Sequence, residues 1–581
     1  MTASAASTSA LRHRTDPHAD ALASTLLAGD DARHDRGRLG YNHLLDIADV
    51  LLESPELRHA PGSRVTASLQ SLAPELVTWF DPIPLPEWVD EAALERASQL
   101  WMANMLPTLA VLYARSLPAC YLIEHGLPAL YATGRLANKR YLYQRLYETG
   151  LMLDAVLSPG GLCVMHDIEE NLDEHLAAVL ADTHPDQQFT REQHKLHAGN
   201  RSQPLDNEAI AAALEQHHHS RRFLAGPGFI AARKVRFLHA AMRYMLCNPH
   251  DCDEAYSDDP VTLAEAFARE TWDADSHGAP VNQQDLLYTL LTFAVDIPEG
   301  LAHWGIRISA QQREDFLHTW RLVGHVMGID DQLLPTTWDE ATRHYREISS
   351  QQARASEAGR EMTETLMQFL EDYIPERFGL RRALPALLIA DQLGERSTEL
   401  LGEDCSRLRE GRFARWAFRF GMQPLRLYFY LSRTAFTLIP PIRMFIGELF
   451  YRVGMAFVAS WRDVYQRRPF YVPDDIYGWK LKQGVNVSFL RELAAWRNQV
   501  FDAICIGVAS WLIALLVLTG AVVLWLLHAP GVTASLWLGV TLSLSALYLC
   551  NVRVPLVMRA RPRIPSDPCV ATGKTAASAS A

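Results

Sequence analysis

The sequence predicts a mostly α-helical protein that ends in a pair of membrane-spanning helices. From about residue 44 to about residue 400, apolar residues recur at spacings of three and four, which is typical of amphipathic helices. Proline and glycine interrupt this pattern, and alternating runs typical of β-strands are few. Near the C-terminus, two uncharged apolar runs follow one another closely, which indicates a hairpin of two spans.

Composition limits the class of protein. The chain has 581 residues, of which 49% are hydrophobic, so it can bury a large core. Its net charge of −12 and its pI near 6.0 argue against nucleic acid as a partner, because binding phosphates requires a basic surface. The eight cysteines are scattered, and no apolar leader begins the chain. We therefore expect reduced thiols in a cytoplasmic domain.

The helical pattern has two irregular regions. Residues 1–43 are rich in small and polar residues with little periodicity, which predicts a mobile N-terminal extension. Residues 44–400 then form the predicted helical domain. Within it, residues 166–219 are crowded with histidines and carboxylates, which indicates a solvated insertion.

Two groups of residues, one within 166–219 and one at 247–252, are candidates for a metal site. A di-iron bundle needs Glu-x-x-His pairs, but Leu172 stands three residues before His175, where the glutamate would be required. A solvated charged face is therefore the favoured interpretation, although the histidines at 217–219 could bind divalent metals adventitiously. Cys247 and Cys252 flank a histidine, yet a structural zinc site would need a further ligand. A polar turn is favoured there.

Residues 401–500 form a basic and aromatic region. Arginines recur between Arg407 and Arg452, interleaved with rings such as Trp416 and Tyr428. This mixture suits an anionic membrane surface, where rings lie at headgroup depth and cations meet lipid phosphate. It equally suits a helical cap on the core whose arginines extend to water. Both interpretations stay open.

Residues 501–552 carry the predicted transmembrane hairpin. The run from Ala503 to Leu527 contains about 25 residues, enough to cross a hydrocarbon core of about 30 Å. A second run, from Val532 to Cys550, contains about 19 residues. Lysines and arginines flank both outer ends, while the connecting turn has none, so both ends and the helical domain of residues 44–400 should face the cytoplasm. A long buried helical pair is the alternative, and residues 553–581 form a basic and then small-residue tail.

A single segment, residues 233–243, suggests a cofactor. At helical spacing, Arg236, His239 and Arg243 share one face, beside an apolar stripe that includes Leu238 and Met242. An imidazole can ligate haem iron, and guanidiniums can pair with haem propionates. A histidine on a helix is more often a core or surface residue, so the spacing alone is a weak signal.

Several segments together resemble one family, the rubber oxygenases or latex-clearing proteins and the membrane-bound oxygenases of mycophenolic acid biosynthesis. Their order and spacing carry the resemblance: 116–118, 133–136, 145–149, 235–243, 282–287, 305–309 and 320–335. The resemblance implies a globin-like helical core around haem b, with His239 as the iron ligand. Arg236 and Arg243 would then lie beside the cofactor.

The resemblance also implies residues on the distal side of the haem. Arg145 and Thr149 match an Arg-x-x-x-Thr pair of the family and, at i and i+4, would share one helix face. Glu148 stands where some members have an iron-capping lysine, which puts such capping in doubt. The family's base precedes this pair, and Glu124 is the nearest acid, in an imperfect register. His303 and His325 rank below His239 as ligands.

The function expected from this resemblance is a membrane-anchored oxygenase. It would use O2 to cleave or oxygenate an isoprenoid or another lipid-like substrate, and whether it needs an electron donor is left open. One alternative is a haem-binding membrane sensor or electron-transfer protein. A second is a membrane scaffold without a cofactor, in which the same histidines and arginines serve packing and lipid contact.

Overall fold

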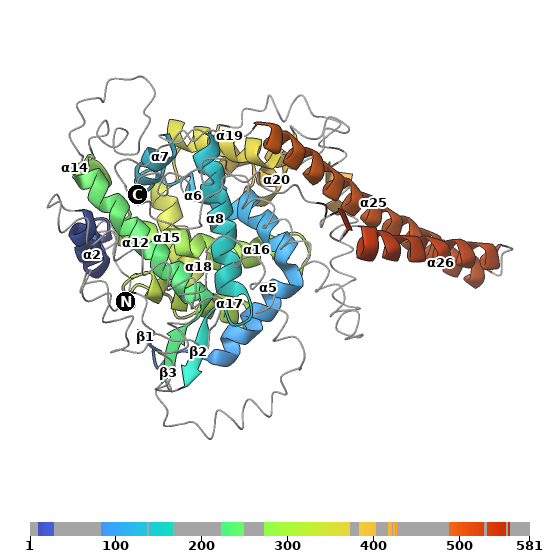
Figure 1. Cartoon of the computed structure of the whole chain (residues 1–581), viewed down its shortest axis with the longest axis horizontal. Helices are drawn as coiled ribbons and strands as arrows, with labels where there is room; N and C mark the ends of the chain where they lie inside the picture. The colour runs from blue at the N-terminus through green and yellow to red at the C-terminus, as the bar shows by residue number, and fades with distance from the viewer. Residues whose placement is uncertain are drawn as a thin grey trace, which may run out of the picture. The chain divides into compact units, whose positions relative to one another are not determined.

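The structure is a computed structural model (Figure 1). It describes residues 10–27, 79, 83–135, 139–166, 222–248, 272–371, 383–402, some positions from 416 to 426, 487–527, 531–553, 556, 557 and 560. The chain divides into two compact units. The first comprises residues 1–366, 386–458 and 467–482, and the second comprises residues 367–385, 459–466 and 483–581.

The first unit is mostly helical, which confirms the predicted all-α class in its coarse form. The π-helical turn η2 (Leu112–Ser116) continues α5 directly. The helices described between residues 10 and 402, of which α19 and α20 include a few residues of the second unit, are α2 (Pro17–Leu27), α5 (Glu91–Val111), α6 (Leu117–Cys120), α7 (Leu127–Arg135), α8 (Lys139–Leu157), α12 (Pro227–Cys247), α14 (Ala274–His277), α15 (Gln283–Ala294), α16 (Asp296–His303), α17 (Ala310–Val326), α18 (Trp338–Gln352), α19 (Glu357–Glu371), α20 (Leu384–Leu393) and α21 (Glu395–Leu400).

A small antiparallel sheet, which the sequence does not predict, joins segments far apart in the chain. Its strands are β1 (Ile83–Pro84), β2 (Cys163–His166) and β3 (Arg222–Ala225), in the order β1-β3-β2. His166 pairs with Arg222, so the strands on either side of the predicted insertion are neighbours. Strands this short carry little alternation, which explains why the pattern along the sequence gives no sign of them.

Local sequence signals fix the starts of the helices around α12. Asn282 caps α15 by accepting hydrogen bonds from the backbone N–H groups of Gln284 and Asp285, both at 3.0 Å. Ser309 and Gln312 form a reciprocal capping box at the start of α17. These two helices pack against one another, and α17 also packs against α5 and α12.

The core of the first unit lies among these helices. Its largest fully buried side chains include Trp101 on α5, Trp320 and Phe316 on α17, and Phe229 and Phe237 on α12. Phe293 stacks on Trp320 with ring centroids 5.0 Å apart. Aromatic side chains bury more apolar area than any others, so they dominate the stability of this packing.

Residues 10–27 differ from the mobile extension that the sequence predicts over residues 1–43. They include α2, which packs against α12 and buries Ala19, Leu22 and Ala23. A helix of 11 residues is too short to be stable alone, so its order depends on the contacts that it makes with the rest of the unit. Composition cannot reveal such contacts, because the partners are distant in sequence.

The second unit contains α25 (Val487–Leu526), α26 (Val532–Tyr548) and the π-helical turn η4 (Leu549–Arg553). The two helices pack against each other, and a Cβ atom added to Gly539 would approach Leu518 Cδ2 to 2.5 Å. The Trp496 ring nitrogen donates a hydrogen bond to the Val557 carbonyl at 2.7 Å. In the part of the chain that the structure describes, no helix combines the length and the apolar character needed to cross a membrane.

Candidate functional site

The helix α12 carries His239 and begins at a sharp turn. Gly226 has φ 101°, a left-handed conformation that glycine adopts without strain, and Pro227 follows at the first helical position. His239 is half-buried, with the buried residues Phe237, Ala240 and Ala241 close by on the same helix. The helix therefore holds an imidazole at the edge of the core.

The helix α8 crosses close to the start of α12. A Cβ atom at Gly228 would lie 2.7 Å from the Ala155 carbonyl oxygen, which only glycine can avoid. The Gly228 backbone N–H donates to the Gly161 carbonyl at 2.7 Å and fixes the same contact. The tight packing brings together the helix of His239 and the helix of Arg145 and Thr149.

The predicted distal residues are only partly placed. Arg145 and Thr149 both lie in α8, as their i and i+4 spacing predicts, and Thr149 is half-buried. The side chain of Arg145 lies outside the described residues. Glu148, which lies between these two residues in the sequence, is half-buried.

Glu124 lies in the turn before α7 rather than on α8. Its backbone N–H donates a hydrogen bond to the Gln352 carbonyl at 3.1 Å, next to the bridge between Ile123 and Ala353. Its side chain is exposed to solvent. A catalytic base is normally tuned by burial, so this environment gives no support to the predicted role, which rests on the resemblance alone.

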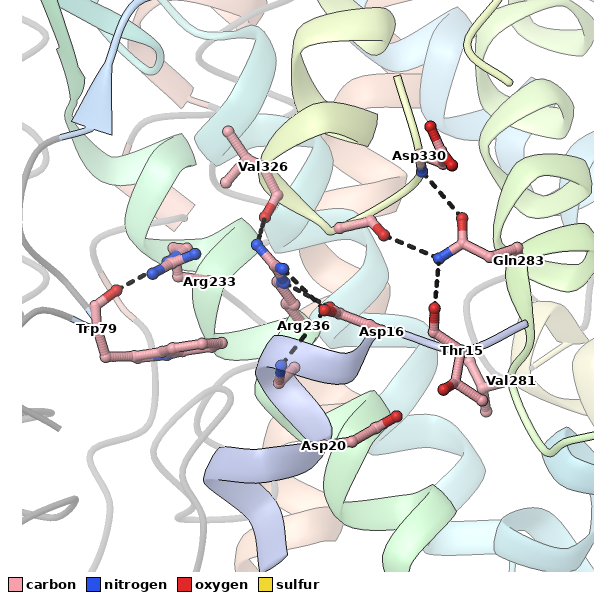
Figure 2. Close-up of polar contacts among 12 residues, drawn as sticks. Thr15, Asp16, Asp20, Trp79, Arg233, Arg236, Val281, Gln283, Val326 and Asp330 are labelled. Atoms are coloured by element: carbon pink, nitrogen blue, oxygen red, sulfur yellow. Dashed lines mark hydrogen bonds and ion pairs between the residues drawn. The ribbon is translucent and has the colours of Figure 1, made fainter. Parts of the chain in front are cut away.

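The most extensive polar contacts around α12 come from residues 10–27, which we call the N-terminal strap. Arg236 donates two hydrogen bonds to Asp16, from Nε at 2.5 Å and from a terminal nitrogen at 2.8 Å, as Figure 2 shows. Its other terminal nitrogen donates to the Val326 carbonyl at the end of α17, at 3.2 Å. This two-pronged geometry is the strongest arrangement of an arginine and a carboxylate.

A second pair lies one turn further along the strap and two turns further along α12. Arg243 donates from Nε to Asp20 at 2.7 Å and from a terminal nitrogen to the Val281 carbonyl at 2.8 Å. The Arg243 side chain is 5% exposed and that of Asp20 is 31% exposed. Two guanidiniums of α12 are thus neutralised by two carboxylates of the strap.

The electrostatics of the Asp16 pair follow from its burial. Desolvation alone would raise the pKa of Asp16, but the hydrogen bond and the positive charge of Arg236 outweigh it and lower the pKa below its usual value. Asp16 is therefore ionised at neutral pH. Removing one member of such a pair leaves a buried charge without compensation.

The strap is also tied to the start of α15. The Gln283 side chain, 3% exposed, donates to the Thr15 carbonyl at 3.0 Å and to the Gly328 carbonyl at 2.9 Å. Its oxygen accepts a hydrogen bond from the Asp330 backbone N–H at 2.9 Å (Figure 2). Arg14 pairs with the Asp330 carboxylate. A single buried amide therefore joins the strap to the turn after α17.

A further arginine of α12 is held from the other side. Arg233 donates to the Trp79 carbonyl at 2.7 Å, and its guanidinium lies 4.1 Å from the centre of the Trp79 ring. Such a cation over an aromatic face is favourable when it is desolvated. Each of Arg233, Arg236 and Arg243 thus has a hydrogen-bond partner among the described residues.

The donor set around His239 fits haem only in part. A half-buried imidazole on a helix is a suitable iron ligand. Arg236 and Arg243, in contrast, already bond to carboxylates, so pairing with propionates would require those contacts to break. Among the described residues, no group of three or more histidine, cysteine or carboxylate side chains is arranged to hold a metal ion.

The other candidate ligands are engaged elsewhere. His303 is hydrogen-bonded to Asp391 at 3.2 Å, and His325 to Asp331 at 2.6 Å. Both contacts lie toward the surface, since these histidine side chains are 40% and 27% exposed. Cys247 is free and exposed at the end of α12, whereas Cys252 and the histidines at 217–219 lie outside the described residues.

The partners missed by the sequence interpretation are Asp16 and Asp20. Asp16 immediately precedes α2 and Asp20 lies four residues after Asp16, so the spacing of these two carboxylates is the one local signal for the contact. Nothing local identifies Arg236 and Arg243 as their partners. That pairing joins residues more than 200 positions apart.

Comparison with known proteins finds one family whose model matches part of this chain. Residues 224–422 match the family model described as the catalytic domain of the ER-bound oxygenase mpaB/B′ and rubber oxygenase. The resemblance predicted from the motifs is thereby confirmed. His239, Arg236 and Arg243 lie inside the matched segment, whereas Glu124, Arg145 and Thr149 precede it.

A curated protein is similar to part of this chain. The rubber oxygenase of Streptomyces sp. (strain K30) is 26% identical over 207 residues, which are 34% of this chain and 45% of that protein. The matched region thus spans less than half of the length of the relative. Among solved structures, latex clearing protein LCP in the closed state is 17% identical with a TM-score of 0.43, covering 72% of this chain and 91% of that one.

Proposed function

We propose that this chain is a haem b-dependent oxygenase that acts on a hydrophobic, isoprenoid-like substrate. The observation that carries the proposal is the match of residues 224–422 to an oxygenase catalytic domain, because this segment contains α12 and His239. The rubber oxygenase relative suggests a polyisoprenoid as the class of substrate.

In this proposal, His239 holds the iron and α12 shields it. Bound haem supplies the binding of O2 and the oxidation chemistry. The protein contributes a fixed imidazole, the apolar side chains around it and polar groups on the facing helix. Thr149 and Arg145, one turn apart on α8, would orient the reacting oxygen and the substrate.

The test is the absorption spectrum of detergent-purified protein, with a pyridine haemochrome assay, for the parent and a His239→Ala variant. We expect a Soret band with near-stoichiometric haem in the parent and its loss in the variant. His325→Ala is the matched control, because His325 is another half-buried helical histidine with a described carboxylate partner. Loss of haem in both variants, or in neither, would contradict the assignment of the ligand.

If haem binds, the next assay is O2 consumption with isoprenoid lipids and detection of carbonyl products. O2-dependent cleavage would support the oxygenase. Stable six-coordination in both redox states without turnover would instead favour a sensor or an electron-transfer protein. Purified protein that is colourless and takes up no hemin would exclude both haem proposals and would favour a membrane scaffold without a cofactor.

We also propose that the pair α25–α26 attaches the protein to lipid. The support is the exposure of large apolar side chains on both helices: Ile506, Ile513, Leu516, Val522, Trp525, Leu526, Trp537, Leu538 and Leu544. That the two helices cross the bilayer completely, with residues 44–400 on the cytoplasmic side, stays a prediction. Release of the protein from membranes by alkaline carbonate would contradict the two spans, and retention in the pellet would support them.

A further inference from the structure

The strap meets α12 at two points on either side of His239. Asp16 bonds to Arg236, three residues before the histidine, and Asp20 bonds to Arg243, four residues after it. Asp16, which immediately precedes α2, and Asp20, which lies within it, thus engage two guanidiniums two turns apart on α12. Figure 2 shows Asp16 at the start of the short helix that carries Asp20 and lies beside α12.

The strap is docked by apolar packing as well as by charge. Ala19 and Ala23 are fully buried and Leu22 is 5% exposed, so the apolar stripe of α2 faces the core. Gln283 and Arg14 add contacts to the start of α15 and to the turn after α17. A segment held in this manner on three elements behaves as part of the fold rather than as a tail.

The geometry restricts how α12 can move. Contacts at two positions two turns apart resist both rotation of the helix about its axis and sliding along it. Arg236 adds a hydrogen bond to the end of α17, and Arg243 adds one to the Val281 carbonyl, so the same side chains tie α12 to its other neighbours. Because His239 lies between these two arginines, the same contacts limit how its imidazole can move relative to the core.

We propose that Asp16 and Asp20 are positioning residues that set the orientation of α12 and thereby of the His239 imidazole. This inference rests on the proposed function only for the role of the histidine. The guanidiniums of Arg236 and Arg243 serve the strap in this proposal, so the anionic groups of a bound cofactor are met by other residues.

The first test measures backbone amide exchange in α12, in full-length protein before haem is added. We expect Asp16→Asn and Asp20→Asn together to speed the exchange of buried amides from 237 to 243 by at least about tenfold, because two charge-assisted contacts are lost. Asp315→Asn is the matched control, since Asp315 is 2% exposed and accepts two bonds from Arg96 on α5. It should speed exchange in α5 and α17 and spare α12.

The second test measures the haem spectrum and the iron midpoint potential of the loaded proteins. The strap variant, which combines Asp16→Asn with Asp20→Asn, should shift the Soret band and the midpoint potential relative to the parent. Asp16→Glu alone keeps a carboxylate and should lie closer to the parent in both. Asp315→Asn should lose stability without either shift. Equal effects of the strap variant and the control would overturn the inference. Unchanged exchange in α12 would also overturn it.

The two proposals fail in different ways. If the parent binds no haem, the oxygenase proposal fails, and the exchange experiment still decides whether the strap restrains α12. If the parent binds haem on His239 and the strap variant leaves both the exchange and the potential unchanged, the positioning role fails and the oxygenase proposal stands.

Discussion

The strap with α12 and the pair α25–α26 show two opposite ways of joining helices. In the first, a short helix becomes ordered through apolar packing and through ion pairs between buried or half-buried side chains, with Arg236 and Asp16 only 13% and 4% exposed. In the second, long apolar sequence forms helices whose large side chains stay exposed, Leu516 at 72% for example. Charge is buried in one region and apolar surface is exposed in the other. The comparison teaches that residue polarity alone does not decide which segment belongs to the core.

The largest effect is expected from breaking the Asp16 pair on one side only. Arg236→Met should lower the free energy of unfolding by about 3–5 kcal/mol, because Asp16 is left as an uncompensated buried charge. Adding Asp16→Asn to this variant should restore part of the loss. Chemical denaturation followed by helical circular dichroism measures both. A larger loss in the double variant than in the single one would show that the pair is not coupled.

A second prediction contrasts Asp16 with a carboxylate whose pKa moves the other way. Burial raises the pKa of Asp285 to about 7, against a hydrogen bond from Asn282 and the positive charge of Arg12, which lower it. The raised value means that its contribution to stability is complete below about pH 4 and is lost as pH rises through about 7.

Asp285→Asn removes this penalty. We expect the variant to gain stability relative to the parent between pH 4 and pH 8, by up to about 4 kcal/mol at the upper end. Thermal unfolding at a series of pH values measures the difference. A difference that does not change with pH would contradict the shifted ionisation of Asp285.

A third prediction concerns the contact between α8 and α12. Gly228→Ala should cost about 1–3 kcal/mol, because the new methyl group would meet the backbone of Ala155, Val156 and Gly161. Gly520→Ala on α25 is the control, since nothing lies within 4 Å of its Cβ position. The control should be neutral or stabilising by up to about 1 kcal/mol. Equal losses in both variants would contradict the close contact.

The smallest effect is expected on the exposed face of α25. Leu516→Gln should change the unfolding free energy of the second unit by less than about 0.5 kcal/mol, because the side chain packs little and glutamine is a good helix former. Thermal unfolding in detergent measures it. A large loss would show that this face is covered within the protein, which would weaken the proposed contact with lipid.

The sequence by itself determined what depends on neighbours along the chain. The helical class follows from the 3.6-residue periodicity, and the family resemblance follows from the order and spacing of motifs between residues 116 and 335, the later of which lie inside the matched segment. The same local information placed Arg145 and Thr149 on one helix, and His239 between two arginines on another. It also located the two C-terminal helices, because an uncharged apolar run is itself the signal.

Only the tertiary structure decided which residues pair across the fold. Residues 10–27 carry too little periodicity to indicate order, yet Asp16 and Asp20 meet Arg236 and Arg243 once α2 packs on α12. Glu124, close in sequence to α8, lies exposed in a separate turn, and β2 pairs with β3 across more than 50 residues. Ion pairs and sheet ladders join distant residues, so their partners are chosen by packing and burial rather than by the pattern of the surrounding sequence.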